Sequence, residues 1–358
     1  MAAPPRFAAR GVLAGRRALQ AAQDRLLPAE LAAFLLSVEF IHSRALGTFA
    51  ELGIADELAR RPATAREIAE RRGLDADALH RVLRLLALRG VVRLSEDGRF
   101  RLTRIGRMVC TDHPKSIRSW VRYVMLDSTQ RAYAGLTDTV RTGEPSFPAV
   151  HGRSVWGHFA DTPEEERLFA ACMRRLTEFD LPSITGGYPW PDEGRVCDVA
   201  GGVGTMLAGI LRAKPRLRGV LVDAPGVLAE AEPYLRDRGV ADRVELSPGD
   251  MFEHVEARAD VYTLKDVLHD WDDERSLRVL KTVRAAMPAG SRVVLVENLQ
   301  EPNVPDPVAS MVDVQMLTQC DGGRQRSVDE LHGLLREAGL RPGEVHRTAG
   351  PSLVEGLA

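Results

Sequence analysis

The chain has 358 residues, with 48 basic and 50 acidic side chains, so its net charge lies near zero. That length is enough for two domains, and the balanced charge excludes a general surface for polyanions. No segment approaches the roughly 18 apolar residues of a membrane span. The four cysteines, at 110, 172, 197 and 320, lie in neither a CxxC pair nor a zinc-type spacing. They predict no disulfide framework and no metal site, and they favour a reducing cytoplasm.

The first residues differ in composition from the rest of the chain. Residues 1–27 are rich in Ala and Arg and hold a single acid, Asp24, a composition that a transit peptide also has. They lack the apolar core of a secretion signal, and we predict a flexible arm over 1–30. The next segment, LAAFLLSVEFIH from Leu31 to His42, is apolar on several sides. This pattern predicts a buried helix that packs on a partner subunit.

Residues 48–107 have the pattern of a winged helix-turn-helix. One helix is predicted over 49–60, and a second begins after Thr64, which has a glutamate three residues later as its capping-box partner. A third helix is predicted over 75–90, ended by a glycine. Two short apolar strands over 91–102, joined by SEDG, predict a hairpin wing.

The arginines of this segment leave two functions open. From Asp56 to Arg107 there are 13 arginines against 8 acids, which is typical of a DNA-binding face. A dimerisation scaffold with a solvated basic face has the same composition, and the enzyme-like remainder of the chain favours it. We therefore predict a winged-helix dimerisation domain over 31–110. The alternative is a DNA-binding regulator that senses a cofactor.

A mostly helical linker with substrate-pocket helices is predicted over 111–182, interrupted by a loop over 141–153. Apolar residues from Trp156 to Phe179 recur at helical spacing, which predicts core packing first and a pocket wall second. Met173 belongs to this stripe and is a predicted substrate contact. A Pro- and Gly-rich link then places the domain boundary near 183 and the catalytic domain over 183–358.

The stretch RVCDVAGGVG, from Arg195 to Gly204, predicts a buried strand followed by a tight glycine turn. The helix expected next would direct its first N–H groups at a ligand over that turn. Leu207 occupies the third glycine position of GxGxxG, which argues against NAD, and no Walker lysine follows. A second strand ends in Asp223, whose carboxylate can accept hydrogen bonds from a ribose. These features predict a nucleoside ligand that lacks a diphosphate.

Further polar residues are expected at the same edge of a doubly wound α/β sheet. Asp250 can accept a hydrogen bond from an adenine amino group, although a cap or turn role is the alternative, and Met251 offers a polarisable surface. His269 follows another strand and precedes acids that fit a helix start better than a metal site. Glu297 ends the neighbouring strand. A carboxylate on one imidazole nitrogen leaves the other free to take a proton, which predicts His269 as a general base oriented by Glu297.

These motifs together resemble those of the S-adenosylmethionine-dependent small-molecule O-methyltransferases, the caffeate and flavonoid type of plants and its bacterial natural-product relatives. The matching runs are DVAGGVG, LVDAPGV, PGDMF, LKDVLHDWDDE, VLVENL and GGRQRS. The resemblance extends from about residue 30 to the end of the chain. It implies a Rossmann-like sheet, a homodimer, methyl transfer without a metal, and His269 and Glu297 as the catalytic pair. The residues that it implies for S-adenosyl-L-methionine are Ala200, Gly202, Gly204, Asp223, Asp250, Met251, Lys265 and Trp271.

Two positions depart from the pattern of that family. Ala200 stands where glycine is usual, and Gln325 stands where an acid that supports the histidine is usual. Because of Gln325, the alternative stays open that this chain is a family member that acts as a decarboxylase or hydroxylase. A helix over 308–319 is predicted to wall the acceptor pocket with Met311 and Met316. Such a wall suits a flat, hydroxylated aromatic or polyketide-like substrate.

Overall fold

The computed structural model describes residues 25–358 together with residues 15, 19 and 22. Most of the arm predicted over 1–30 therefore lies outside the described residues. The described chain forms two compact units, one with residues up to 130 and 162–175, the other with 131–161 and 176–358. None of the described helices is both long enough and apolar enough to cross a membrane.

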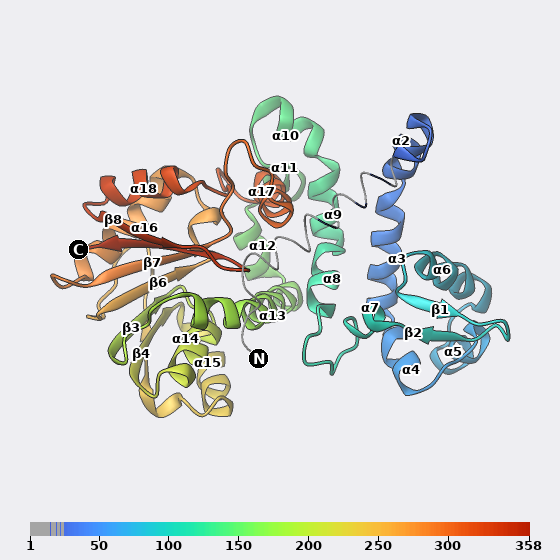
Figure 1. Cartoon of the computed structure of the whole chain (residues 1–358), viewed down its shortest axis with the longest axis horizontal. Helices are drawn as coiled ribbons and strands as arrows, with labels where there is room; N and C mark the ends of the chain where they lie inside the picture. Colours follow the sequence, from blue (N-terminus) through green and yellow to red (C-terminus); the bar gives the residue numbers. More distant parts are fainter. Residues whose placement is uncertain (1–14, 16–18, 20–21, 23–24) are drawn as a thin grey trace. The chain divides into compact units, whose positions relative to one another are not determined.

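The first unit is a set of helices with a two-stranded hairpin (Figure 1). Thr64 begins a helix with the predicted capping box, and Asp75 caps the next one. Val92 pairs with Leu102 across the hairpin, which completes the winged-helix pattern. The elements are α2 (Ala29–Ser37), α3 (Glu39–Glu51), α4 (Ile54–Arg60), α5 (Ala65–Arg72), α6 (Ala76–Leu88), β1 (Val92–Leu94), β2 (Phe100–Leu102), α7 (Arg104–Arg107), α8 (Arg118–Val124) and α9 (Asp127–Ala134).

Two predictions for this unit are wrong. The segment 31–42 is divided between α2 and α3 at Val38, and α2 contains no buried residue. Its apolar side chains are solvent-exposed in the single chain, which leaves packing on a partner as a prediction. The helix expected over 49–60 is broken at Gly53, whose φ of 64° lies in the left-handed region that ends a helix.

The second unit begins with helices whose boundaries differ from those predicted from the sequence. The predicted loop over 141–153 contains a short helix, which starts after Pro145 and ends at Gly152 in the left-handed region. The predicted link begins too early, because the long helix α13 continues through Pro182 to Gly187. Phe179 is 73% exposed, so the stripe is not core throughout. The helices are α10 (Leu136–Thr142), α11 (Ser146–His151), α12 (Val155–Asp161) and, from residue 176 onward, α13 (Pro163–Gly187).

A seven-stranded mixed sheet forms the centre of this unit, in the order β5-β4-β3-β6-β7-β9-β8. The first five strands in that order are parallel, and β9 pairs antiparallel with both β7 and β8. Parallel strands place their carboxyl ends at one edge, where ligands of open α/β sheets bind. The strands are β3 (Glu193–Val199), β4 (Arg216–Asp223), β5 (Val244–Pro248), β6 (Val261–Lys265), β7 (Arg292–Glu297), β8 (Arg341–His346) and β9 (Ser352–Leu357).

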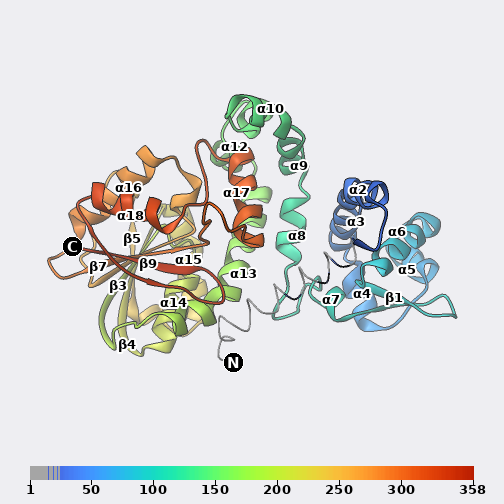
Figure 2. The ribbon, with the colours of Figure 1, turned by 45° about the horizontal axis from the view of Figure 1, so that its top comes forward.

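Helices cover both faces of the sheet, as Figures 1 and 2 show. Strand β7 illustrates why: Val293 and Leu295 pack into the core under α16 and α18, whereas Val294 and Val296 pack into the core under α14 and α15. The predicted doubly wound α/β fold with an N-terminal helical domain is confirmed. The helices of this part are α14 (Thr205–Ala213), α15 (Pro225–Asp237), α16 (Asp273–Ala286), α17 (Pro307–Gln319) and α18 (Val328–Glu337), with 3-10 turns η1 (Ala241–Arg243) and η2 (Leu268–Asp270).

Candidate active site

The glycine turn after β3 is held in place by a backbone hydrogen bond and borders open space. The Ala200 N–H donates to the Val222 carbonyl at 2.8 Å, and Ala200 has a φ of 53°, in the region that L-residues avoid. A Cβ on Gly201 would lie 2.7 Å from the Asp198 carboxylate, so packing requires glycine there. By contrast, no atom lies within 4 Å of a Cβ placed on Gly202. The turn therefore leaves room for a ligand at Gly202.

Asp223 ends the neighbouring strand β4 and is oriented by two backbone donors. The Gly202 N–H donates to Oδ2 and the Ala224 N–H donates to Oδ1, both at 2.8 Å. Burial raises the pKa of Asp223, while these two N–H groups oppose the rise. Each carboxylate oxygen retains a lone pair, so the group can still accept hydrogen bonds from a pair of hydroxyls.

The predicted adenine residues lie around a loop after β5. Asp250 is exposed, and its Oδ1 accepts a hydrogen bond from the Phe252 N–H at 2.9 Å. This bond gives Asp250 the turn role that the sequence allowed beside adenine binding. Met251 is half-buried against the core beneath α16. Trp271 meets the Phe252 ring edge-on at 4.9 Å, and its buried indole Nε1 has no hydrogen-bond partner. An unpaired buried donor is costly, which is a reason to expect a ligand beside this ring.

Lys265 ends β6 and is enclosed by acids. Its ammonium lies 3.3 Å from Asp180 of α13 and also pairs with Asp266. Burial alone would lower the pKa of Lys265, but these two carboxylates outweigh it and raise the pKa. Burial raises the pKa of Asp180 to about 6 in spite of the lysine. The Lys265 cation is thus engaged by carboxylates rather than free for a ligand.

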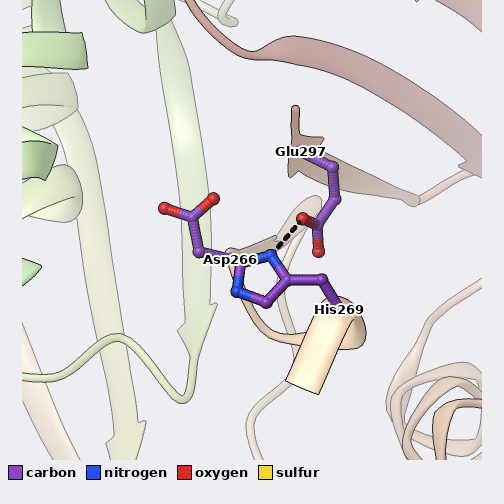
Figure 3. A group of neighbouring side chains, drawn as sticks. All are labelled: Asp266, His269 and Glu297. Atoms are coloured by element: carbon purple, nitrogen blue, oxygen red, sulfur yellow. Dashed lines mark hydrogen bonds and ion pairs between the residues drawn. The ribbon is translucent and has the colours of Figure 1, made fainter. Parts of the chain in front are cut away.

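His269 and Glu297 meet across β6 and β7, as Figure 3 shows. Nδ1 of His269 lies 2.9 Å from Oε2 of Glu297, and the other oxygen of Glu297 accepts from the Leu268 N–H at 3.1 Å. Burial would lower the pKa of His269, but the charges of Glu297 and Asp270 raise it to about 10. Ligand atoms of Asp266, His269 and Glu297 lie within 4.8 Å of one another, so this group also has metal-site spacing.

Asp270 is the second acid beside the imidazole. Its Oδ1 lies 3.5 Å from Nε2 of His269 and 3.8 Å from the Cys320 sulfur. Burial raises the pKa of Asp270 to about 7, although His269 lowers it. Asp270 and Cys320 line a pocket of about 430 Å³, together with Trp271 and the Trp156 ring stacked 5.9 Å from it.

The predicted acceptor residues are not equivalent. Met316 of α17 is buried, whereas Met311 on the same helix is 50% exposed. Helix α17 packs beside α10 and α11 (Figure 1). Met173 belongs to the other compact unit, so its role stays a prediction.

Sequence reasoning missed several residues of this edge. Asp180 reaches Lys265 from a helix far away in the chain, and no motif marks it. Asp266 and Asp270 flank His269 within the recognised run, and a count of acids in KDVLHD could have found both. Four carboxylates therefore surround two basic groups, Lys265 and His269. The acids are Asp180, Asp266, Asp270 and Glu297. Because the acids outnumber the basic groups, the site favours a cationic ligand.

Comparisons with known proteins agree with this architecture. Residues 133–341 match the O-methyltransferase domain family, and residues 34–112 match the O-methyltransferase dimerisation domain. The chain belongs to the O-methyltransferase family of bacterial natural-product pathways, and it is an S-adenosylmethionine-dependent O-methyltransferase.

Three similar proteins illustrate the range of the family. A mitomycin biosynthesis 6-O-methyltransferase from Streptomyces lavendulae is 36% identical over 301 residues, 84% of this chain and 85% of that protein. The aclacinomycin 10-hydroxylase RdmB from Streptomyces purpurascens is 35% identical over 301 residues, 83% and 80% of the two chains. The crystal structure of NcsB1, an O-methyltransferase from neocarzinostatin biosynthesis with S-adenosylmethionine and 2-hydroxy-5-methyl naphthoic acid, is 32% identical with a TM-score of 0.77, covering 88% and 95%.

The residues at the sheet edge fit S-adenosylmethionine. The open space at Gly202, the oriented Asp223 carboxylate and the unpaired Trp271 N–H offer room and hydrogen-bonding groups for a nucleoside. The acids around His269 complement a sulfonium cation.

Proposed function

We propose that this chain methylates a hydroxyl of a small aromatic or polyketide-like metabolite, with His269 as general base and without a metal. The observation that carries the proposal is the 2.9 Å contact between His269 Nδ1 and Glu297, which leaves Nε2 as the proton acceptor. The 3.5 Å separation of Nε2 from Asp270 is too long for a strong hydrogen bond.

In this mechanism, His269 Nε2 takes the proton of the acceptor hydroxyl as that oxygen becomes nucleophilic. Glu297 holds the ring orientation and stabilises the imidazolium that forms. S-adenosylmethionine, when bound, supplies a methyl group activated by a positive sulfur. Asp223 holds the ribose, with Asp250, Met251 and Trp271 on the adenine side and Ala200, Gly202 and Gly204 along the methionine part.

The protonation state of His269 sets a requirement. A base must be neutral, yet the carboxylates hold the pKa of His269 at about 10 in the ligand-free protein. A cation bound nearby lowers the pKa of an imidazole, because two like charges repel. Occupation of the cofactor site therefore prepares the base for proton transfer.

Three contacts support a metal-free site. Both oxygens of Glu297 already accept hydrogen bonds, from His269 and Leu268, and Asp266 pairs with Lys265. A metal at these side chains would compete with these contacts. Loss of activity in EDTA, restored by one divalent metal, would contradict this part of the proposal.

The acceptor class is a small aromatic molecule, in line with the apolar wall that the buried Met316 of α17 offers. The pocket lined by Trp156 and Trp271 also includes Asp250, so it lies on the proposed adenine side. Relatives named for mitomycin and neocarzinostatin pathways support the same class. The experiment is incubation with labelled S-adenosylmethionine and a panel of phenols, naphthols and hydroxyquinones, with products read by mass spectrometry. Transfer of one methyl to oxygen supports the function, and its absence across the panel overturns it.

A homodimer is part of the proposal. Helices α2 and α3 expose an apolar surface within the segment that matches the dimerisation domain. Its exposed residues are Leu31, Phe34, Leu35, Leu36, Phe40 and Ile41. A surface of this kind is stable in water when covered by another chain. Sedimentation of the wild type and of Phe34→Asp distinguishes a dimer from a monomer.

A hydroxylase is the second candidate, because the relative RdmB carries that name and Gln325 replaces the usual acid. The same mass measurement separates the two candidates. Methyl transfer adds a methylene equivalent and takes the label, whereas hydroxylation adds an oxygen atom and leaves the label on the cofactor.

A further inference from the structure

Gln325 has a buried amide without a hydrogen-bond partner. In the described part of the chain it is the one residue with two buried side-chain polar atoms, Oε1 and Nε2, that both lack partners. The residue is 5% exposed. Buried amides are normally hydrogen-bonded, and an unpaired one destabilises the ligand-free protein. A glutamine in this environment is explained if a ligand completes its hydrogen bonds.

Two hydrogen bonds from backbone N–H groups tie the Gln325 segment to the turn that carries His269 and to α17. The preceding residue, Arg324, donates its N–H to the His269 carbonyl at 2.8 Å. The Gln325 N–H itself donates to Asp313 of α17 at 2.7 Å. The segment is therefore held between the turn that carries His269 and the helix predicted to wall the acceptor pocket.

The flanking cations do not satisfy the amide. Arg326 is buried, and its guanidinium binds the carbonyls of Leu268 and Trp271 and the Asp273 carboxylate. Arg324 also binds Asp273. Arg324 pairs with Glu330 of α18 as well, so both guanidinium groups are engaged by other partners, while the Gln325 amide stays unpaired.

The position of Gln325 indicates the acceptor rather than the cofactor. The proposed cofactor residues Gly202, Asp223 and Asp250 follow β3, β4 and β5, on one side of the sheet. The Gln325 segment is tied to the chain after β7, where the Gln300 N–H donates to the Arg326 carbonyl at 3.1 Å. Strands β6 and β7, which carry the His269–Glu297 pair, lie between β3 and the edge formed by β9 and β8.

We infer that the Gln325 amide binds a second hydroxyl on the ring that bears the methylated oxygen. A hydroxyl both donates and accepts, so it satisfies Oε1 and Nε2 together. The natural substrate class is then a dihydroxylated aromatic rather than a simple phenol. This inference rests on the proposed methyl transfer at His269.

The test compares kcat/KM for 1-naphthol with the values for isomeric dihydroxynaphthalenes, in the wild type and in Gln325→Met. The wild type is expected to prefer one dihydroxy isomer, and Gln325→Met should lower that preference roughly tenfold, the cost of about one hydrogen bond. The Kd of S-adenosylmethionine should stay unchanged, and the preference is a ratio of kcat/KM values within one protein, so a general change in turnover does not affect it. The melting temperature of the ligand-free variant should rise, because the unpaired amide is gone.

Gln300→Met is the matched control. The Gln300 amide is paired at both ends, accepting from Ser310 at 3.0 Å and donating to the Glu301 carbonyl at 3.2 Å. This variant should melt at a lower temperature and keep the wild-type preference. An unchanged preference in Gln325→Met, or a lower melting temperature, overturns the inference while leaving methyl transfer intact. If the wild type methylates none of these naphthols, the inference fails, and the wider panel of phenols and hydroxyquinones decides the proposed function separately.

Discussion

Nδ1 of His269 lies 2.9 Å from Oε2 of Glu297, which ends the neighbouring strand β7. The other oxygen of the same carboxylate accepts a hydrogen bond from the Leu268 N–H. Both contacts are short and buried, so the imidazole has one defined orientation. This geometry turns two strand-end residues that are far apart in sequence into one chemical unit.

Replacement of the base gives the first prediction. His269→Ala should lower kcat by roughly 10²–10⁴-fold, the usual contribution of a general base. Calorimetry should show nearly unchanged binding of S-adenosylmethionine, because the nucleoside residues remain. His254→Ala, at an exposed position on the loop after β5, is the control and should keep its activity. Near-full turnover by His269→Ala would remove the histidine from the mechanism.

Glu297→Gln should change the pH dependence of kcat/KM. In the cofactor-free wild type the neutral imidazole becomes more abundant as pH rises toward the His269 pKa of about 10. The kcat/KM for S-adenosylmethionine, which reports the free enzyme, should therefore increase through the alkaline range. Removal of the carboxylate charge should shift this increase to lower pH by roughly one unit or more. The measurement is a pH profile of both proteins; coincident profiles would contradict the role given to Glu297.

The same pair predicts how stability depends on pH. The folded pKa of His269 lies above the value of about 6.5 expected in the unfolded chain, so protonated His269 stabilises the fold fully below that pH. This stabilisation should be lost progressively as pH rises from about 6.5 toward 10. Urea unfolding of Glu297→Gln should show a weaker loss over that window.

Asp223→Asn should weaken binding of S-adenosylmethionine by roughly 10–100-fold, because hydrogen bonds to a charged group contribute about 1.5–3 kcal/mol. The variant keeps an oxygen that can accept from Gly202 or Ala224, so the turn should remain folded. Asp242→Asn, on the exposed η1 turn, serves as the control. Equal affinities for wild type and Asp223→Asn would exclude Asp223 from the cofactor site.

Lys265→Met tests the enclosed ammonium. Removal of this cation leaves Asp180 and Asp266 buried without their partner, which should lower the free energy of unfolding by about 3–5 kcal/mol. The double variant Lys265→Met/Asp180→Asn should recover part of the loss. Lys281→Met, at an exposed lysine of α16, should be neutral. A neutral effect at Lys265 itself would mean that the cluster does not support the fold.

Ala200→Gly tests the strained turn. The left-handed φ of 53° costs an L-residue roughly 1–2 kcal/mol, while glycine adds about 0.5–1 kcal/mol of unfolded-state entropy. The net change should be a gain of up to about 1 kcal/mol in the free energy of unfolding. Ala208→Gly, in the middle of α14, should instead lose stability. Denaturant titration compares the two, and a loss at Ala200 would show that the strain is relieved by other means.

The parts of this protein that local chemistry determines were predictable from its sequence. Strand-end residues such as Asp223, His269 and Glu297 follow apolar runs, and parallel strands must bring their carboxyl ends together. The recurrence of Gly and acid at these ends also identified the fold. Such signals depend on neighbours in the chain, so they can be recognised without a structure.

Other features depend on contacts that no local pattern records. Asp180 meets Lys265 only because α13 continues past Pro182, where the sequence predicted a link. Exposure of α2 also escaped prediction, because an apolar helix has the same composition whether a core or another chain covers it. Sequence flagged Gln325 as a departure, but only packing reveals that its amide is unpaired.

Strand β9 separates β7 from β8, and residue Ser352 is the partner of Glu297 in that pairing. During synthesis, the segments that form the glycine turn and Asp223 leave the ribosome well before β9 does. The glycine turn and Asp223, the proposed nucleoside site, are therefore made while the strand that ends in Glu297 still lacks its neighbour β9. Competence for binding should precede competence for turnover as the protein matures.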